Sequence, residues 1–310
     1  MSFDVQALRD AVAVHGRVAR VVVAQVQGSA PREVGAAMLV WPGGQSGTIG
    51  GGALELDAAA RALTGEDWLE RIALGPARGQ CCGGAVTLVA QVWDAAQLAE
   101  IDGDVVVRRA RGAAQMPLQV KALLRAARAS DAPIETGLVA GWMIEPIAKP
   151  SRHVWIYGAG HVGRAIVSVL APLPDVAITW VDSSADRFPL QTPETITQLV
   201  AGNPADVVQY APSGAEHLVL TYSHAMDLEI CHQLLSHGFA KAGLIGSKTK
   251  WARFGRKLAA LGHSQAQISQ IRCPIGRPEL GKHPQAIAIG VAGEFLAAAA
   301  TLKISQQRAG

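Results

Sequence analysis

The sequence has few cysteines, little excess charge of either sign and no long uninterrupted apolar run. Four cysteines in 310 residues, two of them adjacent, do not make a disulfide framework. The 28 Lys and Arg residues against 25 Asp and Glu leave a net charge of +3, which is too small to favour nucleic acid as a partner. The most apolar helical run, residues 286–302, is interrupted by Glu294 and is short for a bilayer span, so we expect no membrane partner.

The length and the apolar content indicate two folded domains. At 310 residues the chain is about twice the usual domain length. Hydrophobic residues make up 49% of it and charged residues 17%, which is enough for real cores and excludes a disordered chain or a coiled coil. The first ten residues contain Asp4, Arg9 and Asp10 and no apolar signal region, so we expect a cytoplasmic protein.

The first half of the chain mixes helical and strand-like segments without a regular order. The predicted helices cover residues 5–14, 53–63 and 115–129, and the predicted strands cover 17–26, 37–41, 85–93 and 136–144. We expect a smaller mixed α/β domain over residues 1–110. A connecting segment over 111–150 follows and ends in the linker 145–150, where prolines favour extended backbone.

The second half alternates strand and helix, which is typical of a doubly wound parallel sheet. The predicted strands cover residues 153–157, 177–181, 217–222 and 244–245, and the predicted helices cover 162–170, 228–235 and 251–261. We therefore expect an α/β protein whose C-terminal domain, residues 151–310, is a Rossmann-like doubly wound parallel sheet.

A glycine-rich turn joins the first strand and helix of this region. Gly158, Gly160 and Gly163 form the pattern G-x-G-x-x-G with His161 inside it, and Asp182 follows Gly163 by 19 residues. Such a turn lets a pyrophosphate approach a helix N-terminus, and an acidic residue at this spacing binds a ribose hydroxyl. The pattern predicts NAD(P) or another ligand that contains a pyrophosphate. The same glycines would also serve a close strand–helix turn with no ligand.

A second glycine run, Gly50, Gly51 and Gly52, lies immediately before the predicted helix 53–63. Successive backbone N–H groups in such a run can cradle an anion. Arg32, which follows the strand 17–26, could reach the same anion. The alternatives are a mobile turn or a close packing contact for the glycines, and a surface salt bridge for Arg32.

Cys81 and Cys82 lie on a third glycine-rich loop. Their Cα atoms are about 3.8 Å apart across one peptide bond, which is below the normal range for a disulfide. Two thiols on such a loop suit soft metal binding or sulfur handling. The alternative is a pair of partly buried cysteines at the start of a strand.

Two further loops fall at the carboxyl edge of the C-terminal sheet, where doubly wound folds bind ligands. His224 could donate to a phosphate or act as an acid or base, with Asp227 setting its tautomer or capping the next helix. Ser247 can cap the helix that follows the next strand, and Lys248 belongs to a strongly basic helix start where a bound anion would be favourable. A solvated basic helix is the alternative there.

These loops together resemble one family. The chain resembles the XdhC/CoxI family, the xanthine dehydrogenase accessory proteins, in motifs that lie in both halves. They are the residues 28–35, 47–52, 81–84, 157–163, 221–227, 245–250 and 273–276. Each motif alone is modest, but their number and order make a chance match improbable.

The resemblance implies a molybdenum-cofactor chaperone rather than an enzyme. Such proteins bind the molybdenum cofactor, shield it while a cysteine desulfurase-dependent step installs its sulfido ligand, and deliver it to apo xanthine dehydrogenase. The glycine-rich helix starts would hold the phosphate of the molybdopterin, and Cys81 or Cys82 would lie near the molybdenum. We also expect a homodimer. The competing hypothesis is an NAD(P)-dependent oxidoreductase in which His224 and Asp227 act in catalysis and Asp182 binds the ribose.

Overall fold

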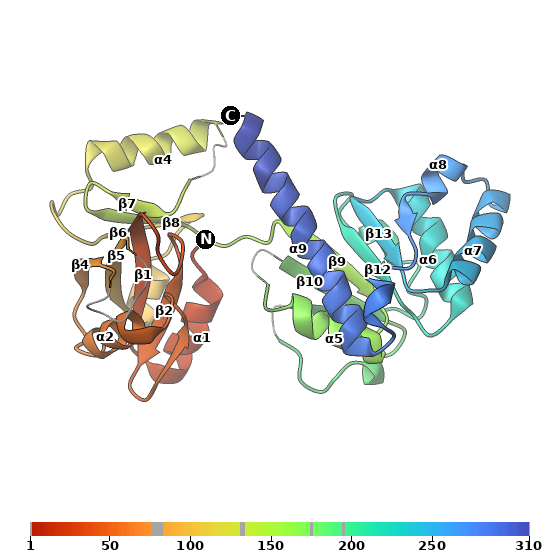
Figure 1. Ribbon diagram of the computed structural model, residues 1–310, viewed down its shortest axis with the longest axis horizontal. Coiled ribbons are helices and arrows are strands. Elements are labelled where there is room, and N and C mark those ends of the chain that lie inside the picture. Colours follow the sequence, from red (N-terminus) through yellow and green to blue (C-terminus); the bar gives the residue numbers. More distant parts are fainter. Residues whose placement is uncertain (1, 76–82, 131–133, 174–175, 194–195, 310) are drawn as a thin grey trace. The chain divides into compact units, whose positions relative to one another are not determined.

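The computed structural model describes residues 2–75, 83–130, 134–173, 176–193 and 196–309. The chain forms two compact units, Met1–Ala148 and Lys149–Gly310 (Figure 1). Each of the five clusters of buried apolar side chains that the described residues form lies within one unit. Among the described residues, no helix is both long and apolar enough to cross a membrane.

The first unit is built on a five-stranded antiparallel sheet. Its strands, in spatial order, are β3 (Gly44–Gly47), β2 (Ala37–Trp41), β1 (Val18–Gln27), β5 (Ala85–Trp93) and β4 (Trp68–Ala73). The strand β5 and most of β1 are buried without alternation because both of their faces are covered. One face packs against α2 (Gly52–Ala62), and the other packs partly against α1 (Val5–His15) and α3 (Ala95–Ala99).

A three-stranded antiparallel sheet completes this unit. It contains β6 (Val105–Arg109), β8 (Trp142–Pro146) and β7 (Gly137–Val139), and α4 (Leu118–Ser130) lies between β6 and β7 in the chain. The prediction of one strand over 136–144 was wrong, because Ala140 and Gly141 both have positive φ, +49° and +82°, and turn the chain into a hairpin. A buried ion pair, Arg20 with Glu145 at 2.8 Å, joins β1 to β8.

The second unit contains a six-stranded parallel sheet. Its spatial order is β11 (Ile196–Val200), β10 (Val176–Asp182), β9 (Arg152–Tyr157), β12 (Glu216–Val219), β13 (Lys241–Leu244) and β14 (Ile271–Arg272). In chain order this is 3-2-1-4-5-6, the order of the Rossmann fold, and its topological switch point lies between β9 and β12. The expected fold class is confirmed for both halves.

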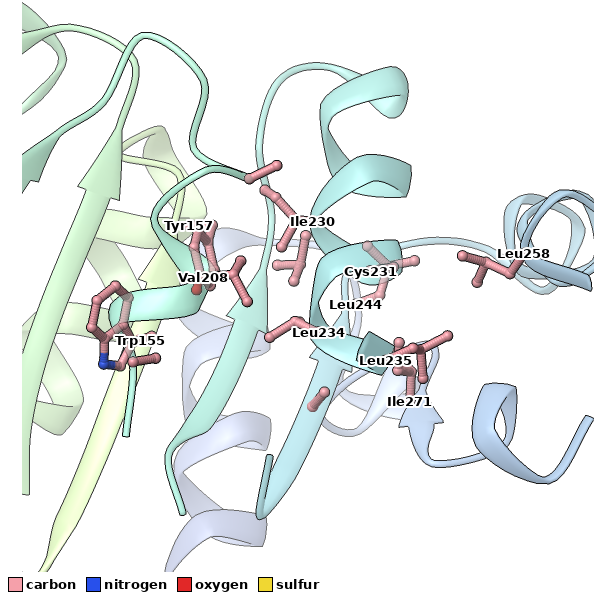
Figure 2. Packing of buried hydrophobic residues seen from close by; sticks show 14 of the residues in the cluster. Trp155, Tyr157, Val208, Ile230, Cys231, Leu234, Leu235, Leu244, Leu258 and Ile271 are labelled. Atoms are coloured by element: carbon pink, nitrogen blue, oxygen red, sulfur yellow. The ribbon is translucent and has the colours of Figure 1, made fainter. Parts of the chain in front are cut away.

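Successive side chains along these strands point to opposite faces of the sheet. Both faces therefore carry apolar residues, and helices cover each of them. Val154 and Ile156 of β9 face α5 (His161–Leu170) and α9 (Pro284–Ala309). Trp155 and Tyr157 face the other side, which α6 (His224–His237), α7 (Lys248–Ala260) and α8 (Gln265–Ile268) cover. Figure 2 shows this second core, in which Ile230 and Leu234 of α6 lie between the sheet and α7.

Candidate functional site

The three glycines of the turn between β9 and α5 differ in how much room the fold leaves for a side chain. Gly158 has φ +122°, and a Cβ added there would collide with the carbonyl of Leu220 at the end of the neighbouring strand β12. A Cβ at Gly163 would collide with the carbonyl of Gly158. A Cβ at Gly160, the N-cap of α5, would meet no atom within 4 Å. The fold therefore requires Gly158 and Gly163, whereas Gly160 leaves the start of α5 open to an approaching group.

A cavity of about 250 Å³ lies over this helix start. It is lined by Ala159, Gly160, His161, Arg164 and Arg187, and none of these described lining residues is acidic. Arg164 is held in place because its Nε donates to the carbonyl of Ala159 at 3.1 Å and its Nη2 donates to that of Arg187 at 2.6 Å. Basic side chains around a helix N-terminus make a site that favours an anion.

Asp182 lies beneath the glycine turn and is only 3% exposed. One carboxylate oxygen accepts from the Ala159 N–H at 2.5 Å, and the other accepts from the Ser183 N–H at 2.7 Å and pairs with Nε of Arg187 at 2.8 Å. The carboxylate therefore fixes the turn and Arg187. A ribose hydroxyl, the ligand expected from the spacing, would share this carboxylate with these partners.

A second basic cavity, of about 350 Å³, lies at the carboxyl ends of β12 and β13. It brings together two residues that the sequence singled out, His224 and Ser247. Ser247 caps α7 by accepting from the Lys250 N–H at 3.1 Å. Lys248 is exposed and does not line this cavity, whereas Lys250, two residues later, does.

Asp227 has neither of the two roles expected from the sequence. Ser223 caps α6, and Asp227 lies four residues further along the chain, in the first turn of the helix. Its side chain is 1% exposed and accepts from Oγ1 of Thr221 at 2.7 Å and from Nζ of Lys250 at 2.6 Å. The carboxylate is thus bound to Lys250 and Thr221 rather than to His224, because α7 brings Lys250 beside it.

The remaining two cysteines lie in this unit. Cys231 is completely buried and Cys273 is half-buried. Burial raises the pKa of the Cys231 thiol well above its usual range and raises the pKa of Cys273 to about 11. Both shifts favour the neutral thiol at neutral pH.

In the first unit, the glycine run before α2 already holds an anion of its own chain. The carboxylate of Glu55 accepts from the N–H groups of Ile49 at 2.9 Å and Gly51 at 3.1 Å and from Oγ1 of Thr48 at 2.5 Å. Burial by itself raises the pKa of Glu55, but the hydrogen bonds from Thr48, Gly51 and Ile49 outweigh it and leave the pKa below its usual value. A phosphate at this loop would face an ionised carboxylate.

The motifs of the first unit lie next to one another in space. A Cβ added at Gly50 would lie 2.5 Å from Cβ of Pro31, and one added at Gly84 would collide with the carbonyl of Ser29. Arg32, beside Gly50, pairs with Glu33 at 3.1 Å, and this pair raises the pKa of the Arg32 guanidinium. Cys81 and Cys82 lie outside the described residues.

Comparison with known families agrees with this arrangement. The model of the XdhC Rossmann domain matches residues 154–295, and that of the XdhC and CoxI family matches residues 11–69. The chain belongs to the XdhC and CoxI family. Its XdhC Rossmann domain contains both basic cavities, and the N-terminal match contains Arg32 and the glycine run closed by Glu55.

Two individual proteins are similar to this XdhC/CoxI chain. The uncharacterized protein YqeB of Escherichia coli (strain K12) is 31% identical over 142 residues, which are 46% of this chain and 26% of YqeB. The match thus spans about a quarter of the curated relative. A crystal structure described as a xanthine dehydrogenase from Bacillus halodurans covers 96% of this chain and 95% of its own, with a TM-score of 0.68 and 19% identity. At that identity the likeness shows a shared fold.

Arg164, Arg187 and Lys250 are residues of the XdhC Rossmann domain that sequence reasoning missed. Arg164 lies in the first turn of α5, and Arg187 lies five residues after Asp182. Their positions near the glycine pattern and its acidic residue could have identified both from the sequence. Lys250 could not be separated from its basic neighbours until its contact with Asp227 was known.

Proposed function

We propose that this protein is an accessory factor in the maturation of xanthine dehydrogenase that carries the molybdenum cofactor. It would bind the cofactor, protect it during sulfuration and deliver it to the apoenzyme. Membership of the XdhC and CoxI family supports the accessory role. The observation that supports cofactor binding is the open, basic cavity at the start of α5.

The chemistry of this cavity suits the phosphate of molybdopterin. The phosphate would accept hydrogen bonds from backbone N–H groups at the start of α5 and from the side chains of His161 and Arg164. His161 is exposed, and its ring has no hydrogen bond or ring contact with any described residue. The first-unit glycine run is the weaker candidate because the Glu55 carboxylate already accepts from the N–H groups of Ile49 and Gly51 there.

The proposal implies two protein partners. A cysteine desulfurase-dependent step would supply the sulfur, and apo xanthine dehydrogenase would receive the loaded cofactor. The cargo role requires no proton transfer by the protein, in keeping with an Asp227 carboxylate that is bound to Lys250 rather than positioned beside His224.

A nicotinamide dinucleotide is the second candidate ligand, because the strand order and the glycine turn are those of NAD(P)-binding folds. Its ribose would compete for Asp182 with Ala159 and Arg187. The pterin content and absorption spectrum of protein purified from a molybdenum-replete host distinguish the two ligands. NADPH turnover without bound pterin would favour the oxidoreductase.

Gly160→Asp tests the glycine turn. The new side chain enters open space, so the variant should fold with an unchanged circular dichroism spectrum, yet its carboxylate would repel a phosphate at the start of α5. We expect pterin retention after gel filtration to fall by about tenfold or more. Gly160→Ser, which adds a small neutral group, should retain more pterin than Gly160→Asp. Wild-type retention in Gly160→Asp would show that the turn is only structural.

The two adjacent thiols are a separate prediction from the sequence. We propose that Cys81 or Cys82 lies near the molybdenum of the bound cofactor. In the double variant Cys81→Ala/Cys82→Ala, we expect less molybdenum and pterin to co-purify, because thiolates are soft ligands for such a metal. Cys231→Ala/Cys273→Ala is the matched control with two thiols removed elsewhere. Full retention by the first double variant would remove these thiols from the mechanism.

A further inference from the structure

One face of α7 carries three cations with no acidic residue among them. Lys250, Arg253 and Lys257 stand at positions i, i+3 and i+7 and therefore share one face of the helix. All three line the cavity of about 350 Å³ at the carboxyl ends of β12 and β13, and none of the described residues that line it is acidic. The residues that line this cavity differ from those that line the cavity at the glycine turn.

Among the residues that the structure describes, an acidic partner is found for just one of these three charges. Lys250 is 11% exposed and pairs with the buried Asp227 at 2.6 Å. Arg253 and Lys257 are exposed, and their side chains make no hydrogen bond or ion pair with any residue that the structure describes. Arg253 and Lys257 are like charges four residues apart on α7, which destabilises a helix. A negative group in the cavity would relieve this repulsion.

The other walls of the cavity suit a small oxyanion with an apolar attachment. Hydrogen-bond donors line the cavity on two sides. They come from His224 and the backbone of Ala225, the first residues of α6, and from the hydroxyl of Thr249 in α7. The ring of Phe254 provides an apolar wall, with the His224 ring edge-on to it at 6.5 Å between centroids. A phosphate ester of a small molecule combines both features.

We propose that the cavity between the starts of α6 and α7 is a second anion site that binds a phosphate-type oxyanion. Arg253 and Lys257 supply the charge, and the Asp227–Lys250 pair holds the two helix starts together. The inference does not depend on the cargo at the glycine turn, because the two cavities share no lining residue.

Two histidines allow the two sites to be followed separately. His224 lines this cavity and His161 lines the cavity at the glycine turn, so their ring NMR signals report on different sites. The signals are assigned by their loss in His224→Asn and His161→Asn. Inorganic phosphate is then titrated into the wild-type protein at constant pH and low salt. We expect a saturable shift of the His224 signal.

Two double variants, each removing two positive charges from α7, provide the decisive comparison. In Arg253→Ala/Lys257→Ala, the phosphate concentration for half-maximal shift of His224 should rise by about tenfold or more. In Lys248→Ala/Arg256→Ala, which removes two charges outside the cavity lining, it should change by less than about twofold. Thermal unfolding verifies that both variants are folded, as expected for exposed residues.

Three outcomes would overturn the proposal. They are no shift of the His224 signal in the wild-type protein, an equal loss of affinity in both double variants, or a full response in Arg253→Ala/Lys257→Ala. A response of His161 without His224 would contradict this second site and leave the glycine-turn cavity standing. A response of His224 without one of His161 would support this second site and contradict phosphate binding in the glycine-turn cavity.

Discussion

At the scale of single residues, the buried carboxylates of this protein are occupied by its own cations and N–H groups. Asp182 holds Ala159 and Arg187, Asp227 holds Lys250, and Glu145 holds Arg20. The sequence singled out Asp182 as a ribose ligand from its spacing to the glycine pattern, and Asp227 as a partner of His224 or a helix cap. It could not identify their partners, which depend on the packing of other elements. Removing one member of a buried pair typically costs about 3–5 kcal/mol.

His217 gives the stability of the second unit a predictable dependence on pH. It is 1% exposed, and its Nδ1 lies 3.2 Å from the Tyr157 hydroxyl. Burial, with a smaller contribution from His237, lowers its pKa to about 3. The unfolded chain binds a proton at His217 below its ordinary pKa of about 6.5, and the native state does not, so stability falls as the pH drops from about 6.5 towards 3.

The expected slope from His217 is up to about 1.4 kcal/mol per pH unit in that range. Urea unfolding of the wild-type protein and of His217→Gln at pH 7, 6 and 5 measures it. The variant is less stable at pH 7 but loses less stability on acidification. His153→Gln, at an exposed position of β9, is the control and should keep the wild-type slope. Parallel curves for the wild-type protein and His217→Gln would contradict the assignment.

At the scale of elements, the sequence predicted the bounds of apolar strands more accurately than the first residues of helices. The strands at 37–41 and 85–93 were predicted with their actual bounds. The helices α6 and α7 begin at His224 and Lys248, four and three residues before their predicted starts. The capping serines Ser223 and Ser247 precede first turns that contain His224 and Asp227 in α6 and Lys248–Lys250 in α7, whereas the prediction began each helix at the apolar residues that follow. This shift places His224 and Lys250 in the first turns that form the second basic cavity.

Several short strands were not predicted at all. These are β3, β4, β6, β11 and β14. The prediction over 244–245 met β13 only at Leu244, because β13 has four residues, among them Lys241 and Gly243, and local propensity is weak. Gly243 is needed there because a Cβ would collide with Ile275, a contact between segments that are distant in sequence. Pairing with neighbours, rather than composition, defines such strands.

At the scale of the whole molecule, the sequence predicted the second unit better than the first. Regular alternation and the glycine pattern predict a Rossmann-like doubly wound parallel sheet, which the structure confirms. The first unit has no such rhythm, because its central strands are buried on both faces and its sheet is antiparallel. The contacts of Gly84 with Ser29 and of Gly50 with Pro31 join segments whose pairing no local pattern encodes.

The separate cores predict that residues 149–310 fold without the rest of the chain. Both clusters of this unit consist only of its own residues. We expect the fragment to give dispersed amide NMR signals and a cooperative thermal transition. A fragment of residues 161–310 is the control, since it lacks the central strand β9 and should not fold. A fragment 149–310 that remains unfolded would show that the first unit is needed for its stability.

The Glu55 side chain has a consequence for the proposed cargo role. Because Glu55 holds the turn before α2 through hydrogen bonds within its own chain, the shape of that turn does not depend on a bound ligand. A substitution at this position that impaired maturation would therefore report a folding defect of the first unit. Its effect should not be mistaken for the loss of a contact with cargo.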